Sequence, residues 1–181
     1  GAGLLSDYRQ AFPDFIRITK QSGRLPSDFM DIVSPAGTLV NMGVLGVVMW
    51  GYVLAVGAPL SGPVLGGILT VLGFGGFGKH PRNAFPVVVG VFAATLLFGF
   101  DPAAPGPILA FFFGTTLAPI AGSFGFGIGF VAGFLHFVLV MRSGAWHAGL
   151  SLYNNGFAGG LTATLVAAVM EWHHQSERRG T

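Results

Sequence analysis

The stretch GPILAFFFGTTLAPIAGSFGFGIGFVAGFLHFVLVM, residues 106–141, decides the fold class, because it contains no Asp, Glu, Lys or Arg. A helix that spans a membrane needs about 20 mostly apolar residues, and this run is long enough for more than one. The whole chain of 181 residues is 52% hydrophobic and only 9% charged, whereas soluble domains carry about 25% charged residues. We therefore expect an all-α fold, that of a polytopic helical membrane protein. Transmembrane barrels are excluded because their short strands alternate in polarity.

Polar residues divide the chain into three parts. Residues 1–34 are rich in charge and space their apolar residues along one helical face, which predicts an amphipathic cytoplasmic or interfacial segment. Residues 35–171 are the expected transmembrane domain, and residues 172–181 are the expected cytoplasmic tail. The domain contains about six membrane segments, which we place at residues 36–56, 60–78, 84–100, 106–122, 124–141 and 148–170. The chain begins with Gly1 rather than Met, which indicates a processed chain or a fragment and leaves open which of the two it is.

The distribution of basic residues predicts the orientation. With six crossings, eight of the 9 Lys and Arg residues fall on the side of the N-terminus, and only Arg142 falls on the other side. Basic residues mark the cytoplasmic side of a membrane protein, so both termini are expected in the cytoplasm of a cell with this chain in its inner (plasma) membrane. The turn between the fourth and fifth segments is very short, so residues 106–141 could instead form broken or re-entrant half-helices, which leaves the orientation unchanged.

Several kinds of chemistry are missing from the sequence. The absence of cysteine excludes thiol catalysis, iron–sulfur clusters and cysteine-ligated zinc. Walker A, HExxH and GxSxG motifs are also absent, and no apolar block contains paired carboxylates. The net charge of +2 is explained by basic cytoplasmic loops rather than by a nucleic-acid partner. We therefore expect no enzymatic activity, no cofactor and no metal site.

Polar side chains within the apolar blocks are the candidates for a solute site. Asn154 and Asn155 precede Gly156, where we expect a helix break, and His136 lies deep in its block. Such groups are costly in a membrane unless they find partners, so each is a candidate functional residue. The alternatives are an amide ladder between helices and a buried neutral imidazole. The complete set of candidate solute-binding residues is Asn154, Asn155, His136, Thr115, Thr116 and Asn41.

Two further patterns have both a functional and a structural interpretation. The glycine-rich stretch before Lys79, His80 and Arg82 could present backbone and cations to an anion, or it could be an ordinary cytoplasmic loop. The glycines at 125, 129 and 133 share one helical face. That face predicts close packing, either within the bundle or with another subunit, and we expect a homo-oligomer or pairing with a related half.

Three motifs resemble the DUF1576 family of bacterial membrane proteins, with a likeness that runs from about Ser27 to Glu171. They are Gly76-Phe-Gly-Lys-His-Pro-Arg-Asn83, Gly114-Thr-Thr-Leu-Ala-Pro119 and Leu152-Tyr-Asn-Asn-Gly-Phe-Ala-Gly-Gly160. The resemblance implies a second-half repeat of a longer, two-repeat membrane protein, and the family name assigns no function. The glycines near Asn41 and the stretch from Ala148 to Gly156 are also faintly similar to urea-transporter repeats.

Together these features predict an integral membrane transporter or channel for a small polar solute, whose site is lined by Asn, Thr and His side chains at broken helices. Its partners would be the lipid bilayer and the solute. The alternative function is a non-transporting membrane subunit, or scaffold, that packs against other proteins through its glycine-rich helix faces.

Overall fold

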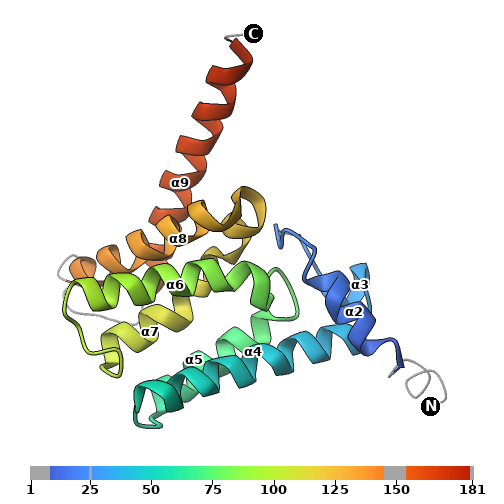
Figure 1. Ribbon diagram of the computed structural model, residues 1–181, viewed down its shortest axis with the longest axis horizontal. Coiled ribbons are helices and arrows are strands. Elements are labelled where there is room, and N and C mark those ends of the chain that lie inside the picture. The colour runs from blue at the N-terminus through green and yellow to red at the C-terminus, as the bar shows by residue number, and fades with distance from the viewer. Residues whose placement is uncertain (1–8, 25, 145–153, 180–181) are drawn as a thin grey trace.

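The computed structural model describes residues 9–24, 26–144 and 154–179. Every regular element in these ranges is helical, which confirms the all-α prediction, and the β-structure described there is one isolated bridge between Asp28 and Phe77. The elements, shown in Figure 1, are α2 (Ala11–Ile18), α3 (Phe29–Ile32), α4 (Pro35–Val56), α5 (Gly62–Phe74), α6 (Pro81–Leu97), α7 (Pro105–Gly114), the 3-10 helix η2 (Thr115–Leu117), α8 (Ala118–Ser143) and α9 (Asn154–Arg179).

Two helical stretches are long and apolar enough to cross a membrane. One is α4, Pro35–Val56, and the other is Pro105–Ser143, which combines α7, η2 and α8. Helices α5 and α6 are apolar but have only 13 and 17 residues. At about 1.5 Å per residue they measure roughly 20 and 26 Å, less than the ~30 Å of a hydrocarbon core. The helix lengths therefore do not establish six full crossings. Part of the sixth expected segment, residues 148–153, lies outside the described residues.

The chain folds back on itself within the long apolar stretch. Gly125 has φ 87° and ψ −177°, so the α8 helix is interrupted there, and its later part runs back beside α6 (Figure 1). Only glycine adopts such a backbone conformation without strain. The segment boundaries drawn from the sequence place a short turn at residues 122–123, and the structure places the turn at Gly125. A second interruption, η2, separates α7 from α8.

Helices α6 and α8 approach so closely that a methyl group would not fit between them. A Cβ atom placed on Gly133 would lie 2.0 Å from the Val87 carbonyl oxygen, and one on Gly90 would lie 2.0 Å from the Phe130 carbonyl oxygen. On Gly129 the Cβ would lie 3.0 Å from the Pro86 Cβ on α6 and 2.4 Å from the Ala121 Cβ on the earlier part of α8. The close packing predicted for the glycines at 129 and 133 is therefore confirmed within the chain, whereas Gly125 faces open space at the turn.

The apolar core lies between α4, α5, α6, α7 and α8. Its largest side chains are fully or almost fully buried. They include Leu45, Met49, Val71, Ile108, Phe112 and Phe137. Tyr52 on α4 stacks flat against Phe111 on α7, with ring centroids 3.6 Å apart. Aromatic stacking and close packing thus hold the apolar helices together.

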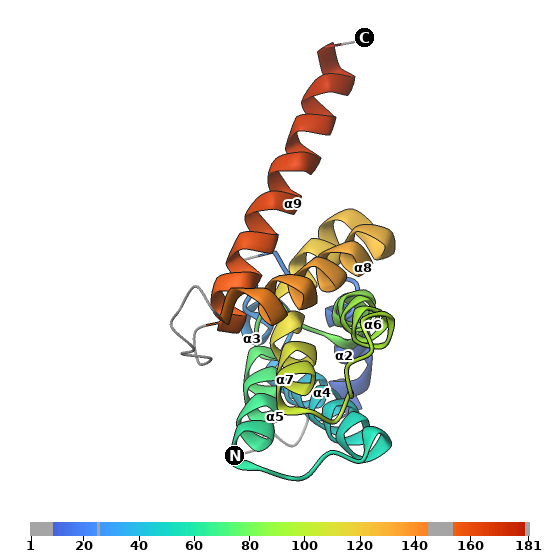
Figure 2. The ribbon, with the colours of Figure 1, turned by 90° about the vertical axis from the view of Figure 1, so that its left-hand side faces the viewer.

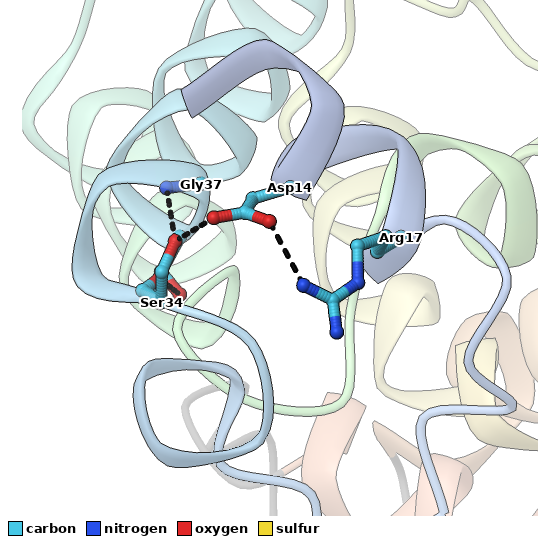
Figure 3. A network of polar contacts seen from close by, with 5 residues as sticks. Asp14, Arg17, Ser34 and Gly37 are labelled. Atoms are coloured by element: carbon cyan, nitrogen blue, oxygen red, sulfur yellow. Dashed lines mark hydrogen bonds and ion pairs between the residues drawn. The ribbon is translucent and has the colours of Figure 1, made fainter. Parts of the chain in front are cut away.

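The N-terminal segment packs on the start of α4 through a polar network, shown in Figure 3. The Ser34 hydroxyl donates to Asp14 Oδ2 at 2.6 Å and accepts the Gly37 amide at 3.1 Å, while Arg17 pairs with the other carboxylate oxygen at 3.1 Å. The hydrogen bond from Ser34 is the main reason that the pKa of the Asp14 carboxyl is below its ordinary value, although burial acts against it. This network caps α4 and fixes α2 beside it.

Helix α9 leaves the bundle. Its first turns lie against α8 and the rest extends away from the other helices, as Figures 1 and 2 both show. Val166 is buried against α8, and Met170 packs there too, whereas Leu165, Val169 and Trp172 on the same helix are exposed. The helix continues through Gly156, so the break expected at that glycine is wrong. The two asparagines need no break to reach partners, because they already lie on the first turn of the helix, beside α8.

Candidate functional site

Asn41 supports the loop that joins α5 to α6. Its amide Nδ2 donates to the carbonyl oxygens of Gly75 and Lys79, each at 2.8 Å, and its side chain is fully buried. The loop therefore has a fixed backbone without belonging to either helix. Asn41 thus holds the backbone of Lys79, and its own Oδ1 has no hydrogen-bond partner in the described chain.

Lys79 follows in the same loop and is buried, with 4% of its surface exposed. Its ammonium donates to the Thr115 hydroxyl at 3.0 Å and lies 4.7 Å from the centre of the Phe74 ring. The Thr115 hydroxyl in turn donates to the Phe112 carbonyl oxygen at 2.6 Å. Burial lowers the pKa of Lys79 to about 8, which leaves the side chain mostly protonated at pH 7. None of the described carboxylates forms an ion pair with this ammonium.

His136 on α8 lies near η2, the 3-10 turn that contains Thr115 and separates α7 from α8. Its ring sits between the end of α7 and the start of α9. Two glycines face its ring. A Cβ on Gly114 would lie 3.2 Å from His136 Cδ2, which is tight, and one on Gly159 would lie 3.9 Å from Nδ1, which is ordinary contact. The Asn155 side chain lies beside the ring. Within the described part of the chain, neither of the ring nitrogens has a hydrogen-bond partner, and Asn155 Oδ1 has none either. Buried polar atoms without partners are rare in proteins.

The remaining two candidates in the solute set have their own partners. Asn154 accepts a hydrogen bond from the Ser143 hydroxyl and donates to the Val140 carbonyl oxygen, so it joins the start of α9 to the end of α8. This contact matches the amide ladder that the sequence left as an alternative. Thr116 is exposed, and its hydroxyl donates to the Phe113 carbonyl oxygen. A Cβ on Gly159 would nevertheless lie 3.6 Å from the Thr116 hydroxyl oxygen, which places Thr116 near His136.

The structure thus brings together two polar pairs across the α7–η2 interruption. One pair is Lys79 with Thr115, and the other is His136 with Asn155. Gly114, which touches His136, is the residue before Thr115, so the two pairs are joined through one peptide unit. The sequence placed Lys79 in a separate loop, and its contact with Thr115 was missed because the two residues are 36 positions apart.

A second, larger concavity lies beside the N-terminal end of α6. It has a volume of about 760 Å³, and its polar lining consists of Thr19, Lys20, Gln21, His80, Arg82 and Asn83, with Phe85 and Phe126 on the apolar side. No Asp or Glu is among its lining residues in the described chain. Lys20 and Arg82 are exposed. The concavity is therefore a basic pocket, and we call it by that name below.

His80 closes the floor of the basic pocket and is 1% exposed. Its Nδ1 accepts the Asn83 amide hydrogen at 3.2 Å and thereby caps α6. Because Nδ1 accepts, the proton is on Nε2, which donates to the Gln21 carbonyl oxygen at 2.8 Å. Burial is the main cause that lowers the pKa of His80. The imidazole is thus a neutral structural group, and it presents no charge to the pocket.

Thr19, Lys20 and Gln21 form one wall of the basic pocket, and the residues that follow them hold this wall in place. Gly23 has φ 76°, and a Cβ there would lie 2.0 Å from the Gly78 carbonyl oxygen. A Cβ on Gly122 would lie 1.9 Å from the Ser22 carbonyl oxygen. Backbone therefore packs directly on backbone at two glycines. Sequence reasoning missed Lys20 and Gln21 as pocket residues, and the isolated Gly23 in a charged segment was the signal that could have indicated this contact.

Among the described residues, no three His, Asp or Glu side chains lie close enough to hold a metal ion. The described chain is thus an all-α protein with two helical stretches that are long and apolar enough to cross a bilayer and with buried polar pairs between its helices.

The chain belongs to a family described as protein of unknown function (DUF1576), whose profile matches residues 8–172. The match includes α2 and the wall of the basic pocket, which precede the three motifs quoted from the sequence. No curated protein and no solved structure matches the chain.

Proposed function

We propose that this chain is a membrane channel or passive transporter for a small polar solute. The observation that carries the proposal is His136, whose two ring nitrogens are fully buried and have no hydrogen-bond partner in the described chain. Leaving a buried polar group unpaired costs about 1–3 kcal/mol. A hydroxyl, amide or water that passes His136 and Asn155 would provide the missing hydrogen bonds.

The interrupted helix supports this proposal. Thr115 belongs to η2, where helical hydrogen bonding changes between α7 and α8. Irregular backbone within a membrane protein is tolerated where it is enclosed by protein or lines a water-filled cavity. Transporters place their solute sites at such discontinuous helices. The two polar pairs near η2, Lys79 with Thr115 and His136 with Asn155, are therefore suitably placed to bind a solute one after the other.

The lack of acidic residues favours passive movement over proton coupling. Between residues 35 and 143 the sequence has one carboxylate, Asp101, which is exposed in the connection between α6 and α7. Proton-coupled transporters use ionisable residues inside the membrane as relays. Within this stretch of apolar helices, His136 would have no buried carboxylate with which to exchange a proton.

The proposed orientation has both termini in the cytoplasm of a multi-pass inner-membrane protein. A cysteine introduced at Thr181, in a chain that has none, is expected to resist a membrane-impermeant maleimide added to intact cells, because the positive-inside rule places Arg178 and Arg179 in the cytoplasm. Permeabilised cells are the control, and they should be labelled. Strong labelling of Thr181→Cys in intact cells would show that the assigned orientation is inverted.

Reconstitution tests the function directly. The purified whole chain in liposomes is expected to accelerate the movement of small polar solutes, measured by stopped-flow swelling with glycerol and urea and by ion-flux assays with chloride, nitrate and formate. Empty liposomes and liposomes with an unrelated helical membrane protein are the controls. If every solute crosses at the rate of empty liposomes, the transport proposal fails. The non-transporting scaffold is then the better assignment, and the open space around Gly156 and Gly160 on α9 would be the surface to examine.

A further inference from the structure

Lys79 is an unusual cation for an apolar bundle. It is the one buried Lys or Arg among the described side chains, and the one buried carboxylate there, Asp14, already pairs with Arg17 and Ser34. Burying an ammonium without a counter-charge is costly in free energy. The fold nonetheless holds the backbone of this residue in place through Asn41.

The ammonium also has unused donors. A lysine ammonium carries three N–H groups, and in the described chain one of them has a protein acceptor, Thr115. A cavity of about 100 Å³ borders Lys79, and its other lining residues are Phe74, Phe77, Gly78, Thr116 and Pro119. The volume is enough for an ion of a few heavy atoms. Most of the cavity wall is apolar, and Lys79 and Thr116 are the residues with polar side chains among those that line it.

The surrounding charges favour an anion over a cation or a neutral molecule. On the loop itself the neighbours are neutral His80 and the exposed Arg82, and the N-terminal wall adds Lys20. Helices α5 and α7 and η2 contain no titratable residue, and α4 contains only Tyr52. The nearest acidic residue by backbone pairing is Asp28 opposite Phe77, and its exposed carboxylate caps the Met30 amide.

We propose that the solute is a small monovalent anion, which the basic pocket attracts through Lys20 and Arg82 and which the Lys79 ammonium then binds beside the Thr116 hydroxyl. This inference rests on the proposed function and specifies its substrate class. The pocket contributes long-range attraction, because a concavity lined by cations and no acids raises the local anion concentration. Lys79 contributes charge-assisted hydrogen bonding, which roughly doubles the strength of a neutral hydrogen bond.

The pH dependence of anion flux tests the role of Lys79. Burial lowers the pKa of Lys79 to about 8, so the ammonium is present below pH 8 and is lost as the pH rises above it. Chloride, nitrate or formate flux through the whole chain is therefore expected to fall by about tenfold between pH 7 and pH 9. Lys79→Arg should remove this fall, because arginine stays protonated at pH 9. Flux of glycerol should not change with pH in either protein.

Charge removal gives the second test. Lys79→Gln should abolish anion flux at every pH, and melting in detergent should establish that the variant is folded. If Lys79→Gln does not fold, the pH dependence of anion flux in Lys79→Arg, compared with that of the unmodified chain, still tests the role of Lys79. Lys20→Gln with Arg82→Gln should lower anion flux several-fold at low ionic strength and little at high ionic strength. If neutral solutes cross and anions do not, or if Lys79→Arg keeps the fall at pH 8, the anion inference is overturned while the proposed function stands. If nothing crosses, both are overturned.

Discussion

Replacement of Gly133 by alanine is expected to destabilise the folded chain by about 3 kcal/mol, at the upper end of what overpacking a core costs. The added methyl carbon would lie 2.0 Å from the Val87 carbonyl oxygen and 2.8 Å from its carbonyl carbon. Backbone atoms cannot rotate out of the way as a side chain can, so α6 and α8 would have to separate. Their separation would also loosen the core around Phe137, which the same helix supplies.

Gly127→Ala is the matched control, because Gly127 lies in the same helix and a Cβ atom there would have no neighbouring atom within 4 Å. Alanine is the better helix former by about 1 kcal/mol, so Gly127→Ala should keep or raise the melting temperature in detergent. Gly133→Ala should lower it by roughly 10 °C. Equal melting temperatures for the two variants would contradict the backbone contact between α6 and α8.

Local patterns were sufficient to predict the helical class and the close packing of Gly129 and Gly133. An apolar run and a regular spacing of small residues each involve residues within about twenty positions of one another. Such local patterns can be recognised in a single sequence. The same information could not give the lengths of α5 and α6. Helix α5 ends early because the Asn41 amide on α4 binds the carbonyl oxygens of Gly75 and Lys79 and holds these residues in a loop.

Candidate site residues were harder to interpret, because each needed a distant partner to define its role. Adjacent asparagines looked equivalent in the sequence, yet Asn154 joins α8 to α9 while Asn155 lies beside His136. Lys79 looked like a residue of a cytoplasmic loop and is instead buried against Thr115. The basic pocket needed the N-terminal segment, which only the folded chain brings next to α6.

The two adjacent asparagines provide the sharpest test of the solute site. Asn155→Leu is expected to reduce solute flux in liposomes at least tenfold, because it removes the amide beside His136, and to leave thermal stability unchanged. Its Oδ1 has no hydrogen-bond partner in the described chain, so the substitution breaks no hydrogen bond through that atom. If Asn155 served only for packing, Asn155→Leu would give the opposite result. The melting temperature would then fall in proportion to any loss of flux.

Asn154→Leu is the control for that experiment, since it changes the preceding residue in the same way but breaks existing contacts. It leaves the Ser143 hydroxyl and the Val140 carbonyl oxygen without their partner. An unpaired buried polar group costs about 1–3 kcal/mol, so Asn154→Leu should melt at a lower temperature. Flux per folded molecule should persist in Asn154→Leu and disappear in Asn155→Leu. If the two variants instead lose stability together and conduct alike, both asparagines serve to join α9 to α8, and the solute site does not include Asn155.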